Sequence, residues 1–103
     1  MDTETKVYTR YSILTEDINR GGVARLCREH RVDCTLYAGV GLFNGNIEES
    51  LTVVHLAPLE ANVREEIKAL ARDIKAENNQ REIWITEETV TLKKLLDSVP
   101  AVG

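Results

Sequence analysis

The chain of 103 residues has few of the residue types that specify disulfide scaffolds and metal sites. Cysteine and histidine occur twice each, and aromatic residues make up only 5% of the sequence. The two cysteines lack the repeated spacing that specifies a zinc site or a disulfide scaffold. Neither histidine has another histidine or cysteine nearby at the spacing of a metal site. We therefore predict no metal site and no cofactor, and we interpret Cys27 and Cys34 as small core residues.

Long apolar runs are also missing. No stretch approaches the roughly 18 residues that cross a bilayer, and residues 1–6 lack the basic start and apolar centre of a secretory signal. These absences favour a cytoplasmic protein with no membrane partner. The excess of 17 acidic over 13 basic residues gives a net charge of −4, which repels a phosphate backbone. We therefore expect no binding to duplex nucleic acid.

The first half of the chain reads as a strand, a helix and a second strand within one expected domain, residues 1–103. Residues 6–14 alternate in a strand pattern, and helical spacing follows until about Arg31. Gly21 and Gly22 fall in the first helical turn, where each costs about 1 kcal/mol relative to alanine. Either the helix starts later, or this backbone is kept open for a ligand or a neighbouring subunit.

A hairpin occupies the middle of the chain. Residues 33–42 and 51–56 are rich in β-branched and apolar residues, and Asn44-Gly45 between them is a strong turn signal. The predicted hairpin is long enough for its far end to project from the body.

A second helix and a final strand complete the pattern. We expect the helix to open at Pro58, with an apolar stripe made by Val63, Ile67, Leu70, Ala71 and Ile74. Residues 82–86 then predict a strand with Trp84 on the face opposite Ile83 and Ile85. The tail, residues 87–96, fits either a strand around 90–92 or a short helix. We favour the strand, followed by a frayed C-terminus.

The resulting order, βαββαβ, predicts an α+β, ferredoxin-like fold. Right-handed crossovers would place both helices on one face of a four-stranded antiparallel sheet. The other face would carry Tyr8 or Tyr11, together with Tyr37 and Trp84. An uncovered face with such side chains usually meets another subunit, so we expect an oligomer.

Two segments resemble a known family. Residues 35–50, TLYAGVGLFNGNIEES, and residues 79–87, NQREIWITE, are similar to segments of small PII-like proteins of phages and bacteria, and the order of elements agrees over nearly the whole chain. The resemblance implies a PII-like homotrimer with ligand sites in clefts between subunits. The tyrosine-bearing T-loop and basic phosphate-binding run of nitrogen-regulatory PII proteins are missing, so ATP binding is not implied.

A more distant resemblance, at the level of the fold, is to the phage S-adenosylmethionine lyases. These are trimeric enzymes whose site lies between subunits and involves a tyrosine and a glutamate. In this chain Tyr37 and either Glu48 or Glu49 would take those roles.

The segment from Gly39 to Ser50 is the candidate site, because it combines three glycines, an aromatic residue and paired carboxylates. Glycine lets a backbone approach a ligand closely. The candidate ligand-binding residues are Arg10, Tyr37, Gly39, Gly41, Phe43, Gly45, Glu48 and Glu49. Some of these residues have a second interpretation. The two glutamates fit solvated turn residues as well as ligand contacts. Phe43 fits either a stacking platform for a ligand or a plug for the subunit interface, and Arg10 fits either an anion ligand or an ion-pair partner of a neighbouring strand.

Three functions fit these residues. The first is a trimer that senses or sequesters a small, nucleotide-like molecule in its clefts, and this requires no activated nucleophile. The second is a small phage-type enzyme, a lyase acting on S-adenosylmethionine, in which positioning and a carboxylate favour an intramolecular reaction. The third is a regulatory protein that binds a partner through the hairpin of residues 39–50. No catalytic residue is assigned, and we favour the non-catalytic interpretation.

Overall fold

The computed structural model describes residues 2–96, which form four strands and two helices. The elements are β1 (Asp2–Glu16), α1 (Arg20–Glu29), β2 (Thr35–Phe43), β3 (Asn46–Pro58), α2 (Arg64–Glu77) and β4 (Trp84–Leu96). Their order is the βαββαβ order that the sequence predicts, and the α+β fold class is confirmed.

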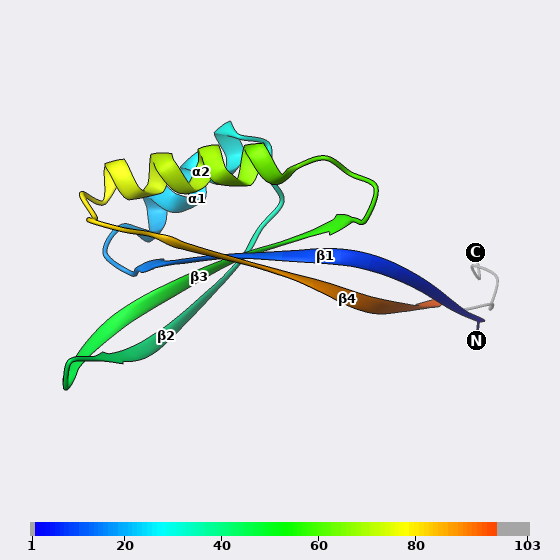
Figure 1. The fold of residues 1–103 in the computed structure, drawn as a ribbon, viewed down its shortest axis with the longest axis horizontal. Helices are drawn as coiled ribbons and strands as arrows, with labels where there is room; N and C mark the ends of the chain where they lie inside the picture. Colours follow the sequence, from blue (N-terminus) through cyan, green and yellow to red (C-terminus); the bar gives the residue numbers. More distant parts are fainter. Residues whose placement is uncertain (1, 97–103) are drawn as a thin grey trace, which may run out of the picture.

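The four strands form one antiparallel sheet in the order β2-β3-β1-β4. Both helices lie on the same face of this sheet (Figure 1). Strands β3 and β1 are the two central strands, and β2 and β4 are the two edge strands. This is the predicted ferredoxin-like arrangement.

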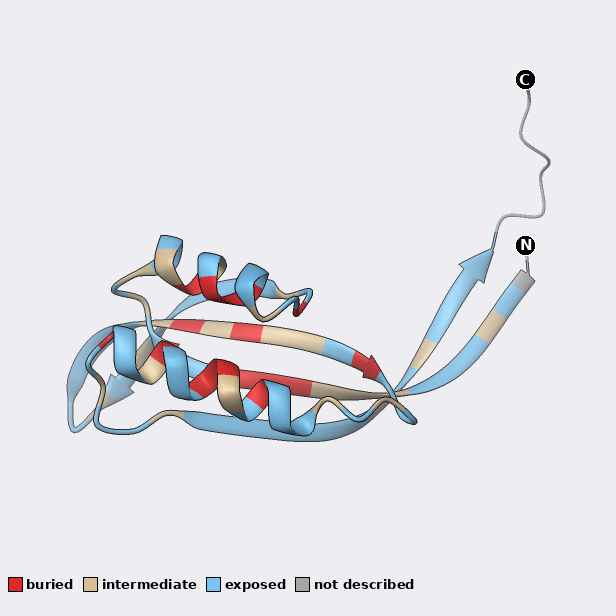
Figure 2. Ribbon diagram, turned by 90° about the horizontal axis from the view of Figure 1, so that it is seen from above, coloured by how far each residue is buried: buried red, intermediate tan, exposed pale blue. Residues whose placement is uncertain are grey.

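The core lies between the helices and the middle of the sheet (Figure 2). Helix α2 contributes Ile67, Leu70, Ala71 and Ile74, each at most 2% exposed, as their spacing predicts. The remaining buried apolar residues are Tyr11, Ile13, Val23, Leu26, Cys27, Val32, Leu51, Val53 and Ala57, with Cys34 and Leu36 packed against them. Both cysteines are free thiols, as expected of core residues.

The connection between β3 and α2 differs from the prediction. Pro58 does not open a helix: it is the last residue of β3, opposite Tyr8, and α2 begins only at Arg64. Proline lacks an N–H to donate, so it suits the end of a strand as well as the start of a helix. Residues 59–63 form a loop instead, and this loop borders a hollow described below.

Strand β4 is longer than predicted. It runs without interruption from Trp84 to Leu96, and its partner throughout is β1. This continuous main-chain pairing overrides the weak local preferences that suggested a separate short strand or helix. Trp84 faces away from the helices, as predicted, because its neighbour Ile85 lies opposite the core residue Ile13. The predicted frayed C-terminus lies outside the described residues.

Helix α1 starts at Arg20, so the delayed start considered for Gly21 and Gly22 is wrong. The side chain of Asn19 caps the helix and accepts a hydrogen bond from the N–H of Gly22 at 3.1 Å. A Cβ atom on Gly22 would collide with the side chains of Asn19 and Glu77, whereas one on Gly21 would meet nothing within 4 Å. Packing between the helices therefore explains Gly22, and nothing in the described structure explains Gly21.

Two double-stranded arms extend beyond the wider part of the sheet. Strands β1 and β3 pair only from Tyr8 to Glu16, so beyond each end only two strands continue. We call residues 40–49, which join β2 to β3, the hairpin arm, and residues 2–7 with 91–96 the terminal arm. The two arms lie at opposite ends of a molecule whose extents are 51 × 29 × 28 Å (Figure 1).

The sheet face opposite the helices is apolar in part and has no cover within the described chain. Leu14, Leu56, Tyr37 and Trp84 lie on this face and are exposed, whereas Tyr11 faces the helices and is buried. Exposed apolar side chains gathered on one uncovered face of a sheet are typical of an interaction surface.

Candidate functional site

The alternation of β2 decides which candidate residues share a face. Leu36 lies opposite Val53, and Ala38 lies opposite Leu51, and both partners are core residues beneath the helices. Successive side chains of a strand point to opposite faces. Tyr37, Gly39 and Gly41 therefore lie on the sheet face that the helices leave open.

The two glutamates of the hairpin lie on opposite faces. Glu48 pairs with Gly41, so it shares the open face with Tyr37, whereas Glu49 pairs with Val40 on the other face. Tyr37 and Gly41 are four strand residues apart, which is about 13 Å. We call this stretch of the open face, with Tyr37 at one end, Gly39 and Gly41 along it, and Glu48 at the other end, the glycine strip.

Gly39 has no structural reason to be glycine within the described chain. It is an ordinary strand residue without a positive φ, and a Cβ atom there would meet only Ser50 Oγ, at a comfortable 3.5 Å. Glycine inside a strand weakens it and commonly marks a close approach by a ligand or another backbone. The absence of a side chain at Gly39 therefore has no explanation within residues 2–96.

Of the other candidate residues, Arg10 lies away from the strip, whereas Phe43 and Gly45 lie just beyond Gly41 at the tip of the hairpin. Arg10 belongs to β1 and forms an ion pair with Glu88 of β4, with Nη2 and Oε1 2.7 Å apart. Asn44 and Gly45 form the turn of the hairpin, both with positive φ, as the Asn-Gly signal predicts. Phe43 ends β2 opposite Asn46.

An acidic hollow of about 290 Å³ lies where the hairpin arm leaves the body. Its lining residues are Glu16, Asp17, Ile18, Glu48 and Glu49. Asp17 is held by the guanidinium of Arg20, and its backbone N–H donates to the carbonyl of Glu49 at 3.2 Å. Because β1 ends here, Glu48 and Glu49 flank the exposed edge of β3 from both faces. The resulting negative potential disfavours phosphate groups.

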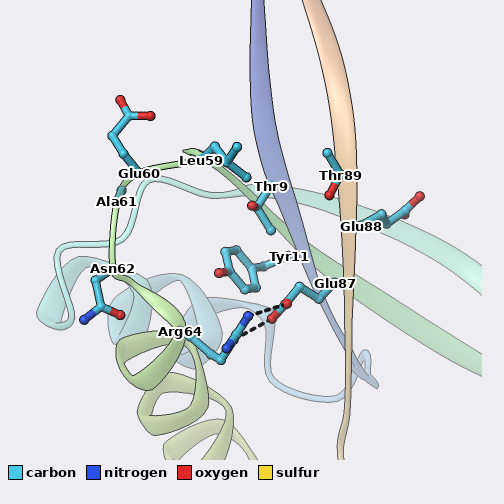
Figure 3. Close-up of a pocket in the computed structure, with 10 residues that line it drawn as sticks. All are labelled: Thr9, Tyr11, Leu59, Glu60, Ala61, Asn62, Arg64, Glu87, Glu88 and Thr89. Atoms are coloured by element: carbon cyan, nitrogen blue, oxygen red, sulfur yellow. Dashed lines mark hydrogen bonds and ion pairs between the residues drawn. The ribbon is translucent and has the colours of Figure 1, made fainter.

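A larger hollow of about 410 Å³ lies beside the start of α2 (Figure 3). It is lined by Thr9, Tyr11, Leu59, Glu60, Ala61, Asn62, Arg64, Glu87, Glu88 and Thr89. Arg64 bonds both carboxylate oxygens of Glu87, at 2.9 and 2.7 Å, and this contact lowers the pKa of that carboxyl. The guanidinium is thus already occupied, and the carboxylates of Glu60 and Glu88 leave the hollow acidic as well.

Solved structures share this fold. CPII from Thiomonas intermedia K12, a nitrogen regulatory PII-like protein bound to ADP, AMP and bicarbonate, matches with a TM-score of 0.60 and 9% identity, over 90% of this chain and 100% of CPII. A phage SAM lyase in complex with S-methyl-5′-thioadenosine matches with a TM-score of 0.60 and 9% identity, over 85% of this chain and 90% of the lyase. This chain has the PII-like fold.

The similarity to known proteins is limited to the fold. No model of a protein family matches the chain, and no curated protein matches its sequence. Within residues 2–96, neither helix has the length and apolar character needed to cross a bilayer. The same residues bring together no group of three His, Cys, Asp or Glu side chains placed to hold a metal ion.

The larger hollow contains no residue that sequence reasoning selected as a site. The prediction that α2 opens at Pro58 concealed the loop of residues 59–63, which forms one wall of the hollow in this PII-like fold. One usable signal was present, since Thr9 and Tyr11 put polar groups on the helix-facing side of β1. Buried or half-buried hydroxyl groups on an otherwise apolar face indicate a nearby polar cavity.

Proposed function

We propose that this chain forms a homotrimer and binds a small, nucleotide-like molecule in the clefts between subunits, on the glycine strip. The observation that carries this proposal is Gly39, whose missing side chain is required by no contact with the described residues. Tyr37 stands at one end of the strip, exposed by 57%, and offers an aromatic face for a flat ring. Glu48 at the other end offers an acceptor for hydroxyl or amino groups.

Assembly is supported by the open sheet face. Leu14, Leu56 and Trp84 are exposed there next to the strip, and a neighbouring subunit would cover them. The glycine strip would then lie at the margin of the covered area, where one subunit ends and the next begins. PII-like proteins with this fold include one that binds ADP and AMP, which supports a ligand with an adenosine-like part.

A second function, a lyase acting on S-adenosylmethionine, is favoured by charge. Glu48 and Glu49 form no ion pair with the described residues, and the adjoining hollow adds Glu16 and Asp17. Carboxylates and an aromatic face suit a sulfonium cation and disfavour a polyphosphate. Tyr37 and Glu48 share one face, so both could contact the same bound molecule. Catalysis would rest on holding that molecule in a reactive conformation.

The test is native mass spectrometry of the purified protein with ADP, AMP, S-methyl-5′-thioadenosine and S-adenosylmethionine, each added separately. We expect a trimer that retains at least one of these molecules. Consumption of S-adenosylmethionine into new products would select the lyase. A trimer that ignores all four would contradict the ligand proposal and direct attention to a protein partner for the hairpin.

Two neighbouring glutamates provide a matched pair of variants. Glu48→Gln should weaken binding of the retained molecule by about tenfold or more, since a hydrogen bond to a charged group is typically worth 1.5–3 kcal/mol. Glu49→Gln removes the same charge from the other face and should bind as the wild type does, when the two are compared at a protein concentration at which both form the trimer. Equal effects of the two variants would show that bulk charge, and not the glycine strip, determines binding.

Gly39→Val tests the strip directly. Valine favours strands, and the space above Gly39 accepts a Cβ atom, so the variant should fold with unchanged circular dichroism. Its side chain would stand where the ligand is proposed to lie, so binding should be lost. Retained binding in a folded Gly39→Val protein would place the ligand elsewhere, with the larger hollow the next site to test.

A further inference from the structure

The two arms carry opposite charges. The hairpin arm contains Glu48 and Glu49 and no basic residue, whereas the β4 half of the terminal arm contains Lys93 and Lys94 and no acidic residue. None of these four side chains forms an ion pair with another residue in the described part of the chain. The β1 half of the terminal arm adds Asp2, Glu4 and Lys6, and Glu4 lies directly opposite Lys94, whereas Lys93 lies opposite Thr5. The charges that face no opposite charge within their own arm are therefore those of Glu48, Glu49 and Lys93.

The hairpin arm also exposes aliphatic side chains on one face. Val40, Leu42 and Ile47 are 70%, 73% and 74% exposed, and Leu42 lies directly opposite Ile47. Glu49, opposite Val40, shares this face. The face therefore combines three uncovered aliphatic groups with one carboxylate.

The terminal arm has the complementary face. Val7 and Leu95 are 44% and 64% exposed, and the alternation of β4 places Lys93 between them on the same side. Lys94 lies on the reverse side, as Glu48 does in the hairpin arm. Each face thus pairs exposed aliphatic groups with one charge, and the two charges have opposite sign.

These complementary surfaces cannot meet within one chain, because the arms point away from opposite ends of the 51 Å molecule (Figure 1). We propose that the hairpin arm of one copy docks on the terminal arm of the next copy, so that the two aliphatic faces meet with Glu49 beside Lys93. The inference rests on the assembly part of the proposed function and adds a second contact between copies to the one proposed for the open sheet face.

Such a contact joins two different surfaces, so it repeats from copy to copy and must close into a ring or continue as a filament. A ring of three copies would bring a neighbour's terminal arm to the base of each hairpin arm. That base adjoins the glycine strip, so each ligand site would be bordered by a second copy. Burial of five exposed aliphatic side chains would supply attraction, and the charges would set the orientation.

Charge reversal tests the docking. Glu48→Lys/Glu49→Lys and Lys93→Glu/Lys94→Glu should each weaken self-association by about tenfold or more, because like charges then face each other. The variant with all four reversals should assemble as the wild type does. Molar mass by light scattering over a dilution series, without ligand, gives the readout, and circular dichroism confirms folding. Exposed residues of α2 provide a control, Lys68→Glu/Arg72→Glu, that should leave the mass unchanged.

Mixing the two double variants reports the number of copies in the ring. Every contact between unlike variants is favourable, so an even ring can alternate them without conflict. A ring of three must contain at least one contact between like variants. The mixture should therefore form trimers less well than the fourfold variant does at the same concentration. Full trimer recovery in the mixture would contradict the head-to-tail ring.

The outcomes separate this inference from the proposed function. A trimeric wild type whose fourfold variant stays dissociated would overturn the docking and leave the trimer intact. Double variants that assemble normally would overturn it equally. A wild type that stays monomeric at every concentration would overturn the proposed assembly itself. Because these measurements contain no ligand, failure of ligand binding would appear only in the mass spectra described above.

Discussion

The larger hollow and the hairpin arm differ in how their charges are satisfied. Beside α2, Arg64 is bonded to both oxygens of Glu87, and across the sheet Arg10 is paired with Glu88. In the hairpin arm, Glu48 and Glu49 have no ionic partner among the described residues, and aliphatic side chains stand in solvent. These ion pairs of the body are complete within a single chain, whereas the charges of the hairpin arm have no partner in its described residues.

This contrast assigns different roles to the two regions. A two-stranded ribbon without a covered face is marginally stable alone, so its length needs a reason outside local stability. The wider sheet and the two helices supply the packing that holds residues 2–96 together. No residue of the hairpin arm belongs to that core, and the ligand and the neighbouring copy that we propose would both contact this arm.

The largest expected effect separates a core leucine from an arm leucine. Leu70 is fully buried, and Leu70→Ala should lower the free energy of unfolding by about 2–5 kcal/mol through lost contacts and a residual cavity. Leu42 is 73% exposed, and Leu42→Ala should change it by less than about 0.5 kcal/mol in the monomer. Urea titrations at two protein concentrations measure both effects.

Concentration sharpens this test. The cost of Leu70→Ala should be present at both protein concentrations, whereas a cost of Leu42→Ala should emerge only where copies associate. A large cost of Leu42→Ala in dilute protein would mean that the arm folds as part of the core, and the contrast between body and arm would fail.

Two glycines give the next effect. Gly22→Ala should destabilise the protein by about 1–2 kcal/mol, because the new methyl group displaces the Asn19 cap and the Glu77 carboxylate. Gly39→Ala, on the glycine strip, should change stability by less than about 0.5 kcal/mol and act on ligand binding instead. Thermal unfolding followed by circular dichroism compares the two, and Gly21→Ala, which meets no atom, serves as the helical control.

The outcome for Gly39 is the informative one. If Gly39→Ala destabilised the protein as much as Gly22→Ala does, the fold itself would require glycine at position 39. A stable Gly39→Ala protein with weakened binding would support the external reason. Gly21→Ala should stabilise by about 0.5–1 kcal/mol, since alanine is the better helix former.

Local patterns were sufficient for the order of elements. The stripe of Ile67, Leu70, Ala71 and Ile74 and the turn at Asn44-Gly45 each depend on neighbours close in sequence, and both predictions are confirmed. The extent of β4 was missed because its continuity comes from β1, which lies about 80 residues earlier. Pro58 was misassigned because its missing N–H is compatible with either a strand end or a helix start.

The candidate site was predictable only in part. The sequence pointed to residues 39–50, but the separation of Glu48 from Glu49 depends on the pairing register, in which a shift of one residue exchanges the faces. Arg10 was weighed both as an anion ligand and as an ion-pair partner, and its contact with Glu88 required the position of β4. The opposite charges of the two arms can meet only between copies, because the arms lie at opposite ends of a 51 Å molecule. That distance depends on the whole fold and cannot be read from any short segment of the sequence.

The smallest expected effect is a pH dependence confined to the body. The ring nitrogens of His30 lie 2.6 Å from Glu66 Oε1 and 2.6 Å from Asp73 Oδ2, so both bonds form only when the ring is an imidazolium. The Glu66 contact is the main cause that raises the pKa of His30. The stabilisation is therefore fully present below the unfolded pKa, about 6.5, and is lost as the pH rises through the higher folded pKa.

Urea titrations at pH 6 and pH 8.5 should show that the wild type loses stability relative to His30→Gln over this interval. The difference should be about 1 kcal/mol or less, because both carboxylates are half exposed to water. Glu49→Gln, in the hairpin arm, should leave the difference unchanged, since that carboxylate has no cationic partner in the described chain. A difference between wild type and His30→Gln that stays flat with pH would mean that the contacts of His30 with Glu66 and Asp73 add nothing to the stability of the body. Paired charge at this site of the body would then have no measurable advantage over the unpaired carboxylates of the hairpin arm.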